Sequence, residues 1–202
     1  MLIGSYFYAE LPIMKAKYLL VAAALFFIMP SCKKKEVVTD VPVSDTTQTY
    51  FSVRQFLQDQ LQTYWGQPYS LHRIATVNGK VDSSMVNFSN MEWAPIYKAF
   101  LDADIGFIKY LGHYKFSRFE TDQTGNVTLS YDATEEKLFT RTLQLQVDPT
   151  NDRILNIYIQ TRKDSKSQKL LYIPLKVIQI QEDDASWTGS KQNIRLEYRF
   201  LQ

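Results

Sequence analysis

Apolar residues recur along this chain with two different periods, and the first of them predicts two helices. Across residues 50–65 they return every three or four positions, which places them on one face of an α-helix. Either Thr49 or Ser52 can serve as its N-cap. A second helix is expected with Asn90 as its cap and an apolar stripe running from Trp93 to Leu101. Each helix therefore has one face that must be buried against another element.

Alternation of apolar and polar residues predicts strands in most of the remaining chain. Asn78-Gly79 separates two such runs, and this dipeptide is preferred in two-residue type I′ hairpins because both positions need a positive φ. From His113 onward the alternation continues to the C-terminus, with short turns between the runs. The segment 170–180 is interpreted as one long strand in which Pro174 marks a bulge or a sheet edge. Strands spaced this closely indicate an antiparallel meander.

These patterns together predict an α+β fold, with two N-terminal amphipathic helices packed on a predominantly antiparallel β-meander sheet. The helices would cover one face of the sheet and leave the other in water. Residues 50–202 form this single domain, since about 150 residues is a usual domain length. The preceding stretch, 32–49, is polar and has no aromatic residue, so it is expected to be a flexible tether.

A third pattern, basic and then apolar, occupies the N-terminal region 1–31. Lys15 and Lys17 precede an apolar run of 11 residues from Leu19 to Met29, and Pro30-Ser31-Cys32 follow. This order is typical of a secretory signal peptide. The run is shorter than the ~20 residues that a membrane-spanning helix needs. We therefore expect residues 1–31 to be a leader and signal peptide.

The residues before Cys32 resemble the lipobox of bacterial lipoproteins. Met29 lies three positions before the cysteine and Ser31 lies directly before it, whereas Pro30 departs from the usual pattern. In that class the thiol is joined to a diacylglycerol, the leader is removed and the new N-terminus is acylated. The resemblance implies lipidation at Cys32, with the membrane as partner through the anchor. Lysine rather than aspartate at position 33 favours the outer membrane, and the lack of the acidic tract that marks surface export favours the periplasmic side.

Two further motifs lie in the predicted domain, namely Arg73-Ile74 in the first hairpin and the run Phe100 to Ile105 at the end of the second helix. With the lipobox, their order resembles a group of uncharacterised lipoproteins common in Bacteroidota. The resemblance covers residues 50–200. It implies a cell-envelope location and this fold, and no activity comes with it.

Charge and cysteine content exclude several classes of function. The chain has 23 Lys and Arg and 21 Asp and Glu, and removal of residues 1–31 takes away only Lys15, Lys17 and Glu10. The near balance gives no electrostatic footprint for nucleic acid. Because Cys32 is the only cysteine, the chain can form no internal disulfide and no thiolate zinc site.

Four side chains are candidates for chemistry. His72 and His113 could bind a metal together with Asp102 or Asp104, and the two aspartates could form an acid/base pair. The alternatives are two unrelated surface histidines, and aspartates that cap or solvate a helix end. The chain has no nucleophile elbow, phosphate loop or zinc-protease motif. We therefore expect no cofactor, no metal site and no enzymatic activity.

The sequence thus favours a non-enzymatic accessory or binding lipoprotein of the cell envelope, with another envelope protein as a possible partner. Two alternatives stay open. One is a carrier that holds an apolar or lipid ligand in a cavity of a curved sheet, lined by the abundant aromatic residues. The other is a hydrolase that uses Asp102 or Asp104 with His113.

Overall fold

The computed structural model describes residues 49–120, 125–185 and 191–201, all of which belong to one compact unit of the chain, 40–202. These residues form two α-helices, two 3-10 turns and nine strands. The elements are α2 (Val53–Tyr64), β1 (Ser70–Val77), β2 (Lys80–Asn87), η1 (Phe88–Asn90), α3 (Trp93–Asp102), η2 (Ile108–Tyr110), β3 (Tyr114–Glu120), β4 (Val127–Ala133), β5 (Thr140–Asp148), β6 (Arg153–Lys163), β7 (Lys166–Ile173), β8 (Val177–Asp184) and β9 (Gln192–Phe200).

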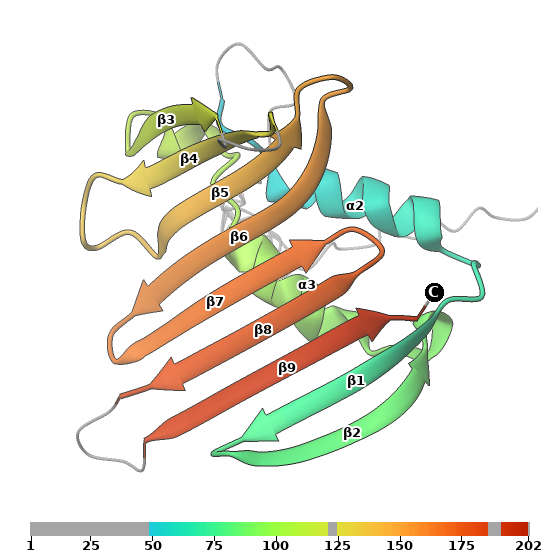
Figure 1. The fold of residues 1–202 in the computed structure, drawn as a ribbon. Coiled ribbons are helices and arrows are strands. Elements are labelled where there is room, and N and C mark those ends of the chain that lie inside the picture. Colours follow the sequence, from blue (N-terminus) through green and yellow to red (C-terminus); the bar gives the residue numbers. More distant parts are fainter. Residues whose placement is uncertain (1–48, 121–124, 186–190, 202) are drawn as a thin grey trace, which may run out of the picture. The chain divides into compact units, whose positions relative to one another are not determined.

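All nine strands belong to one sheet, in the order β2-β1-β9-β8-β7-β6-β5-β4-β3, and every neighbouring pair is antiparallel. Strands β3 to β9 follow one another as a meander, and β9 then pairs with β1. The hairpin β1–β2 therefore ends the sheet on one side and β3 ends it on the other (Figure 1). The segment between β2 and β3, which contains α3, has to cross the whole sheet.

Both α-helices pack against the same face of this sheet, and in Figure 1 they lie behind the strands. Their apolar stripes meet the inward side chains of the strands in one core. The α+β class is therefore confirmed as an open antiparallel sheet with two helices. The largest fully buried apolar side chains are Phe88, Phe100, Leu71, Ile105, Leu143, Leu145, Ile157, Ile159, Leu170 and Val53.

The predicted cap of the first helix is confirmed and that of the second is wrong. The Oγ atom of Ser52 accepts a hydrogen bond of 3.2 Å from the backbone N–H three residues later, which fits one of the two predicted caps. Asn90 instead belongs to η1, and α3 starts only at Trp93, after a residue whose side chain makes no capping hydrogen bond. The indole N–H of Trp93 donates to the Phe88 carbonyl at 3.0 Å. With Phe88 buried in this extra turn, the helix starts two residues later than predicted.

The predicted hairpin turn at Asn78-Gly79 and the predicted continuous strand over 170–180 had different outcomes. Asn78 and Gly79 have φ values of 50° and 82°, as a type I′ hairpin requires, and they join β1 to β2. The single strand predicted over 170–180 is wrong, because the chain reverses between Ile173 and Val177. The Lys176 N–H donates to the Ile173 carbonyl at 3.0 Å, which closes a turn around Pro174. Alternation continues on both sides of this turn, so the pattern of apolar residues does not mark it.

None of the helices in the described part of the chain is long and apolar enough to cross a membrane.

Candidate functional site

An open groove of about 570 Å³ lies beside the turn between β7 and β8. One wall is the face of α2 that carries Phe56, Gln60 and Tyr64, and the others are the start of β6 and the β7–β8 turn. The sheet brings these segments together because Ile157 of β6 pairs with Tyr172 of β7, just before the turn. The apolar side chains that line the groove are Phe56, Ile154, Leu155, Ile173, Pro174 and Leu175.

Polar side chains are also part of the groove lining. Arg153 and Lys176 supply two positive charges, and Gln146 and Asn156 supply amides. The Asn156 amide donates to Gln146 Oε1 at 2.7 Å, which fixes both amides on the sheet. An apolar wall with cations beside it matches an amphipathic ligand that carries a negative group.

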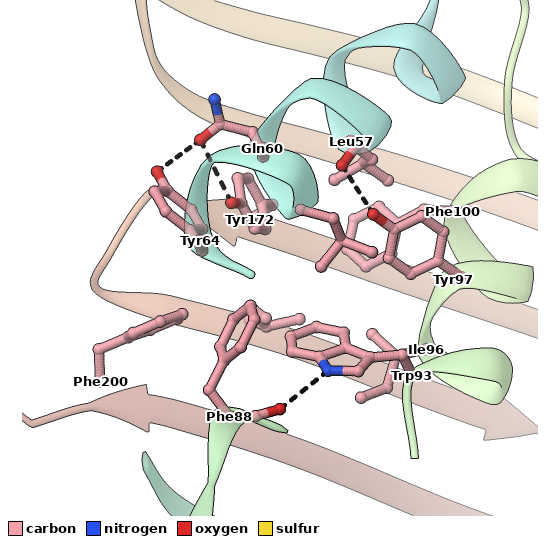
Figure 2. Close-up of a pocket in the computed structure, with 12 residues that line it drawn as sticks. Leu57, Gln60, Tyr64, Phe88, Trp93, Ile96, Tyr97, Phe100, Tyr172 and Phe200 are labelled. Carbon is pink, nitrogen blue, oxygen red and sulfur yellow. Dashed lines mark hydrogen bonds between the residues drawn. The ribbon is translucent and has the colours of Figure 1, made fainter. Parts of the chain in front are cut away.

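Gln60 lines both this groove and a second, smaller space inside the core. Figure 2 shows the residues around the smaller space. The Oε1 atom of Gln60 accepts hydrogen bonds from the hydroxyl groups of Tyr64, at 2.6 Å, and Tyr172, at 3.5 Å. Burial raises the pKa of both tyrosines above the usual value. Both hydroxyl groups therefore stay neutral at physiological pH and act as hydrogen-bond donors to Gln60.

The inner space between α2, α3 and the sheet is almost full. Its volume is about 20 Å³, which is room for one water molecule. Aromatic side chains from both helices and from η1 and β9 fill it, including Phe100, Trp93 and Phe200 (Figure 2). A drug-sized ligand needs at least about 300 Å³. An acyl chain therefore has no room in this inner space, whereas the groove outside it is one of several surface spaces that exceed this size.

Asp104 is buried, and its carboxylate accepts hydrogen bonds from the start of α2 and from the loop that follows α3. Its carboxylate accepts backbone N–H groups from Val53 and Gly106, both at 3.0 Å, and from Arg54 at 3.4 Å. The Ser52 hydroxyl donates to it at 3.2 Å. These donors include the free N–H groups of the first turn of α2, which a negative charge stabilises. Asp104 thus caps a helix that precedes it in the sequence.

Asp102 and His113, the other members of the predicted hydrolase set, have partners of their own. Asp102 is half-exposed and forms an ion pair of 2.7 Å with Lys98, one helical turn away. The Nδ1 atom of His113 lies 2.9 Å from a carboxylate oxygen of Glu135. Hydrogen bonds from Lys137 and His113 hold the pKa of Glu135 below its usual value. No described contact joins His113 to either aspartate, so the hydrolase alternative gains no support.

His72 and His113 are also far apart in the sheet. His72 is in β1, next to one edge strand, and His113 directly precedes β3, the opposite edge strand. No cluster of three or more potential metal ligands occurs among residues 49–120, 125–185 and 191–201. The metal pairing of the two histidines is thus unsupported within these ranges.

Sequence reasoning missed a charged cluster on the sheet face opposite the helices. Glu197 is only 4% exposed, and both Arg195 and Arg199 bind its carboxylate. Burial alone would raise the pKa of Glu197, but the hydrogen bonds and charges of the two arginines outweigh burial and lower it. The alternation Arg-x-Glu-x-Arg was a usable signal, because period two puts the three side chains on one face.

The groove was missed as well, since the chain was expected to continue straight through Pro174. Its lining comes from segments more than a hundred residues apart in sequence, such as Phe56 and Leu175. Cys32 and its leader lie outside the described residues, so lipidation remains a prediction.

Comparisons with family models, with curated proteins and with solved structures gave no match. The residues of the Phe100–Ile105 motif nevertheless have a structural explanation. Phe100, Ala103, Asp104 and Ile105 are all buried, and Asp104 caps α2. Packing and capping therefore account for these buried residues of the motif.

Proposed function

We propose that this protein is a non-enzymatic binding lipoprotein of the cell envelope, attached to the outer membrane through acyl chains on Cys32. The observation that carries the proposal is the order of basic residues, apolar run and Cys32 ahead of a polar stretch. Each buried methylene of an acyl chain contributes about 0.8 kcal/mol, and two or more chains hold a protein firmly. The folded unit then needs no membrane-binding surface of its own.

The start of the described domain supports a tethered arrangement. The Tyr50 hydroxyl donates to the Tyr114 carbonyl at 2.9 Å and accepts the Gly112 N–H at 3.0 Å. The Tyr50 ring also meets the rings of Tyr114 and Tyr131 edge-on. The predicted tether lies outside the described residues except for Thr49, and it would connect a lipid-bearing terminus to this fixed point.

Replacing Cys32 with alanine is expected to release the protein from the membrane, because the acylated atom is lost. Fractionation of cells into membrane and soluble parts measures this, and we expect nearly all of the variant in the soluble part or retained as unprocessed precursor. Ser31→Ala is the matched control, since it keeps a small residue before the cysteine and should leave the protein mature and membrane-bound. Mature Cys32→Ala protein that stays in the membrane part as fully as the parent would contradict the anchor.

A second candidate function is carriage of an amphipathic, negatively charged ligand such as a fatty acid. The groove supports it, because about 570 Å³ lies within the usual range for ligand sites. Its apolar wall would take the chain, and Arg153 and Lys176 would take the negative group. This version differs from the sequence-based expectation of a cavity enclosed by the sheet.

Leu175→Asp is expected to weaken fatty-acid binding at least about tenfold, since it places a like charge in the apolar wall. Leu175 has a φ of 55°, a conformation that aspartate adopts more readily than leucine, so the fold should tolerate the change. Displacement of a fluorescent fatty-acid probe measures the affinity. Ile108→Asp is the control, because Ile108 is exposed and lies outside the groove. Equal affinities of both variants would exclude the groove as the binding site.

A further inference from the structure

Strand β2 forms one edge of the sheet, where it ends the strand order (Figure 1). No other described strand pairs with its outer side, and seven of its eight residues are exposed. The Phe88 N–H donates to the Tyr69 carbonyl at 2.9 Å, in line with the register that pairs Val77 with Lys80. In an antiparallel pair the bonded residues alternate, so even-numbered residues of β2 bond to β1. The N–H and C=O groups of Val81, Ser83 and Met85 therefore point away from the sheet.

The opposite edge strand, β3, has the protection that β2 lacks. It carries the charged residues Lys115, Arg118 and Glu120, and its Tyr114 N–H donates to the Tyr50 hydroxyl at 3.3 Å. Charged side chains and covered edge groups are the usual means of preventing strand addition. Between positions 81 and 87 of β2 the single charged residue is Asp82. Arg73 pairs with it at 3.2 Å.

The exposed apolar side chains of β2 are arranged symmetrically about Ser83. Val81 and Met85, which are 68% and 60% exposed, lie two residues before and two residues after it. Their partners in β1 are Thr76 and His72, so both side chains project from the sheet face opposite the helices. A two-fold axis through Ser83 would place Val81 opposite the partner's Met85 on that same face.

We propose that β2 is a dimerisation edge, at which two copies of this chain pair antiparallel with Ser83 at the centre. Every outward N–H and C=O group of Val81, Ser83 and Met85 then gains a partner, because these residues form the bonded pairs of the new ladder. The apolar pair forms twice by symmetry, and cross-strand apolar pairs are stabilising. Arg73 neutralises Asp82 in each copy, which limits repulsion across the axis. This inference does not depend on the ligand or on the anchor.

Cysteine crosslinking in membranes from cells that express the full chain tests the pairing. Ser83→Cys is expected to give a crosslinked dimer with a short bifunctional thiol reagent, since the two introduced thiols face each other. Ser117→Cys is the control, because Ser117 lies in the middle of the opposite edge strand, β3, with its side chain on the same face of the sheet, but its own N–H and C=O groups bond to β4 rather than point outward. The unsubstituted chain controls for Cys32. Equal crosslinking of the two variants, or a crosslinked product that contains another protein, overturns the proposal.

A charge exchange on the Ser83→Cys background tests the register. Val81→Lys with Met85→Lys places like charges opposite each other and should reduce the dimer at least about tenfold. Val81→Glu with Met85→Lys in the same chain places opposite charges together and should restore it. Loss of the dimer in both double variants would overturn this register, since only the like-charge combination is repulsive across the axis. If the dimer persists in both double variants, the proposed pairing through positions 81 and 85 is overturned.

Discussion

Asp104→Ala is expected to destabilise the folded protein by about 4 kcal/mol, because it leaves several buried hydrogen-bond donors without an acceptor. The carboxylate accepts from Val53, Arg54, Gly106 and Ser52, and the aspartate is only 2% exposed. Each buried donor left unpaired costs about 1–3 kcal/mol. Water that enters the space left by the carboxylate offsets part of this cost.

The free energy of unfolding is measured by denaturant titration, with tryptophan fluorescence as the signal. Asp102→Ala is the matched control, since Asp102 belongs to the same segment but is half-exposed and forms an exposed ion pair with Lys98. Its cost should stay below about 0.5 kcal/mol, as for other exposed ion pairs. Asp104→Asn keeps one acceptor oxygen, so its cost in unfolding free energy should lie between those of Asp104→Ala and Asp102→Ala. If Asp104→Ala cost no more than the control, the interpretation of Asp104 as the cap of α2 would be wrong.

The features that the sequence predicted well depend on neighbours in the chain. The Asn78-Gly79 turn needs two positive φ angles, which these residue types supply without help from the rest of the protein. Ser52 caps α2 through a bond to a backbone group three residues away. Strict alternation identified the last strand, β9, and with it the antiparallel class of the sheet.

The features that could not be predicted from the sequence depend on contacts between distant segments. Asp104 was interpreted as a possible acid or base, but it binds the Val53 N–H, 51 positions earlier in the chain. The pairing of β1 with β9 joins opposite ends of the domain, and no local pattern encodes it. The turn at Pro174 contains no glycine, and Leu175 takes a positive φ there. The groove could not be predicted because it depends on that turn and on the place of α2.

The same contact between Asp104 and the start of α2 explains why position 106 is glycine. A Cβ atom at Gly106 would lie 2.7 Å from both Cα and Cβ of Ser52, and 3.2 Å from Asp104 Oδ1. Real Cβ atoms do not approach backbone atoms so closely, so either α2 or the 104–106 loop has to move. Both movements lengthen the hydrogen bonds to the Asp104 carboxylate.

Gly106→Ala is therefore expected to cost about 3 kcal/mol in the free energy of unfolding, the upper part of the range for overpacking. Gly112→Ala is the control, because Gly112 has a φ of 82° and open space around it. Its cost reports backbone strain alone, which is about 1 kcal/mol. The double variant Asp104→Ala with Gly106→Ala should cost clearly less than the sum of the single variants, since both changes disrupt the same bonds. Additive costs would mean that Gly106 acts independently of the cap, and the close packing of this loop on α2 would then need another explanation.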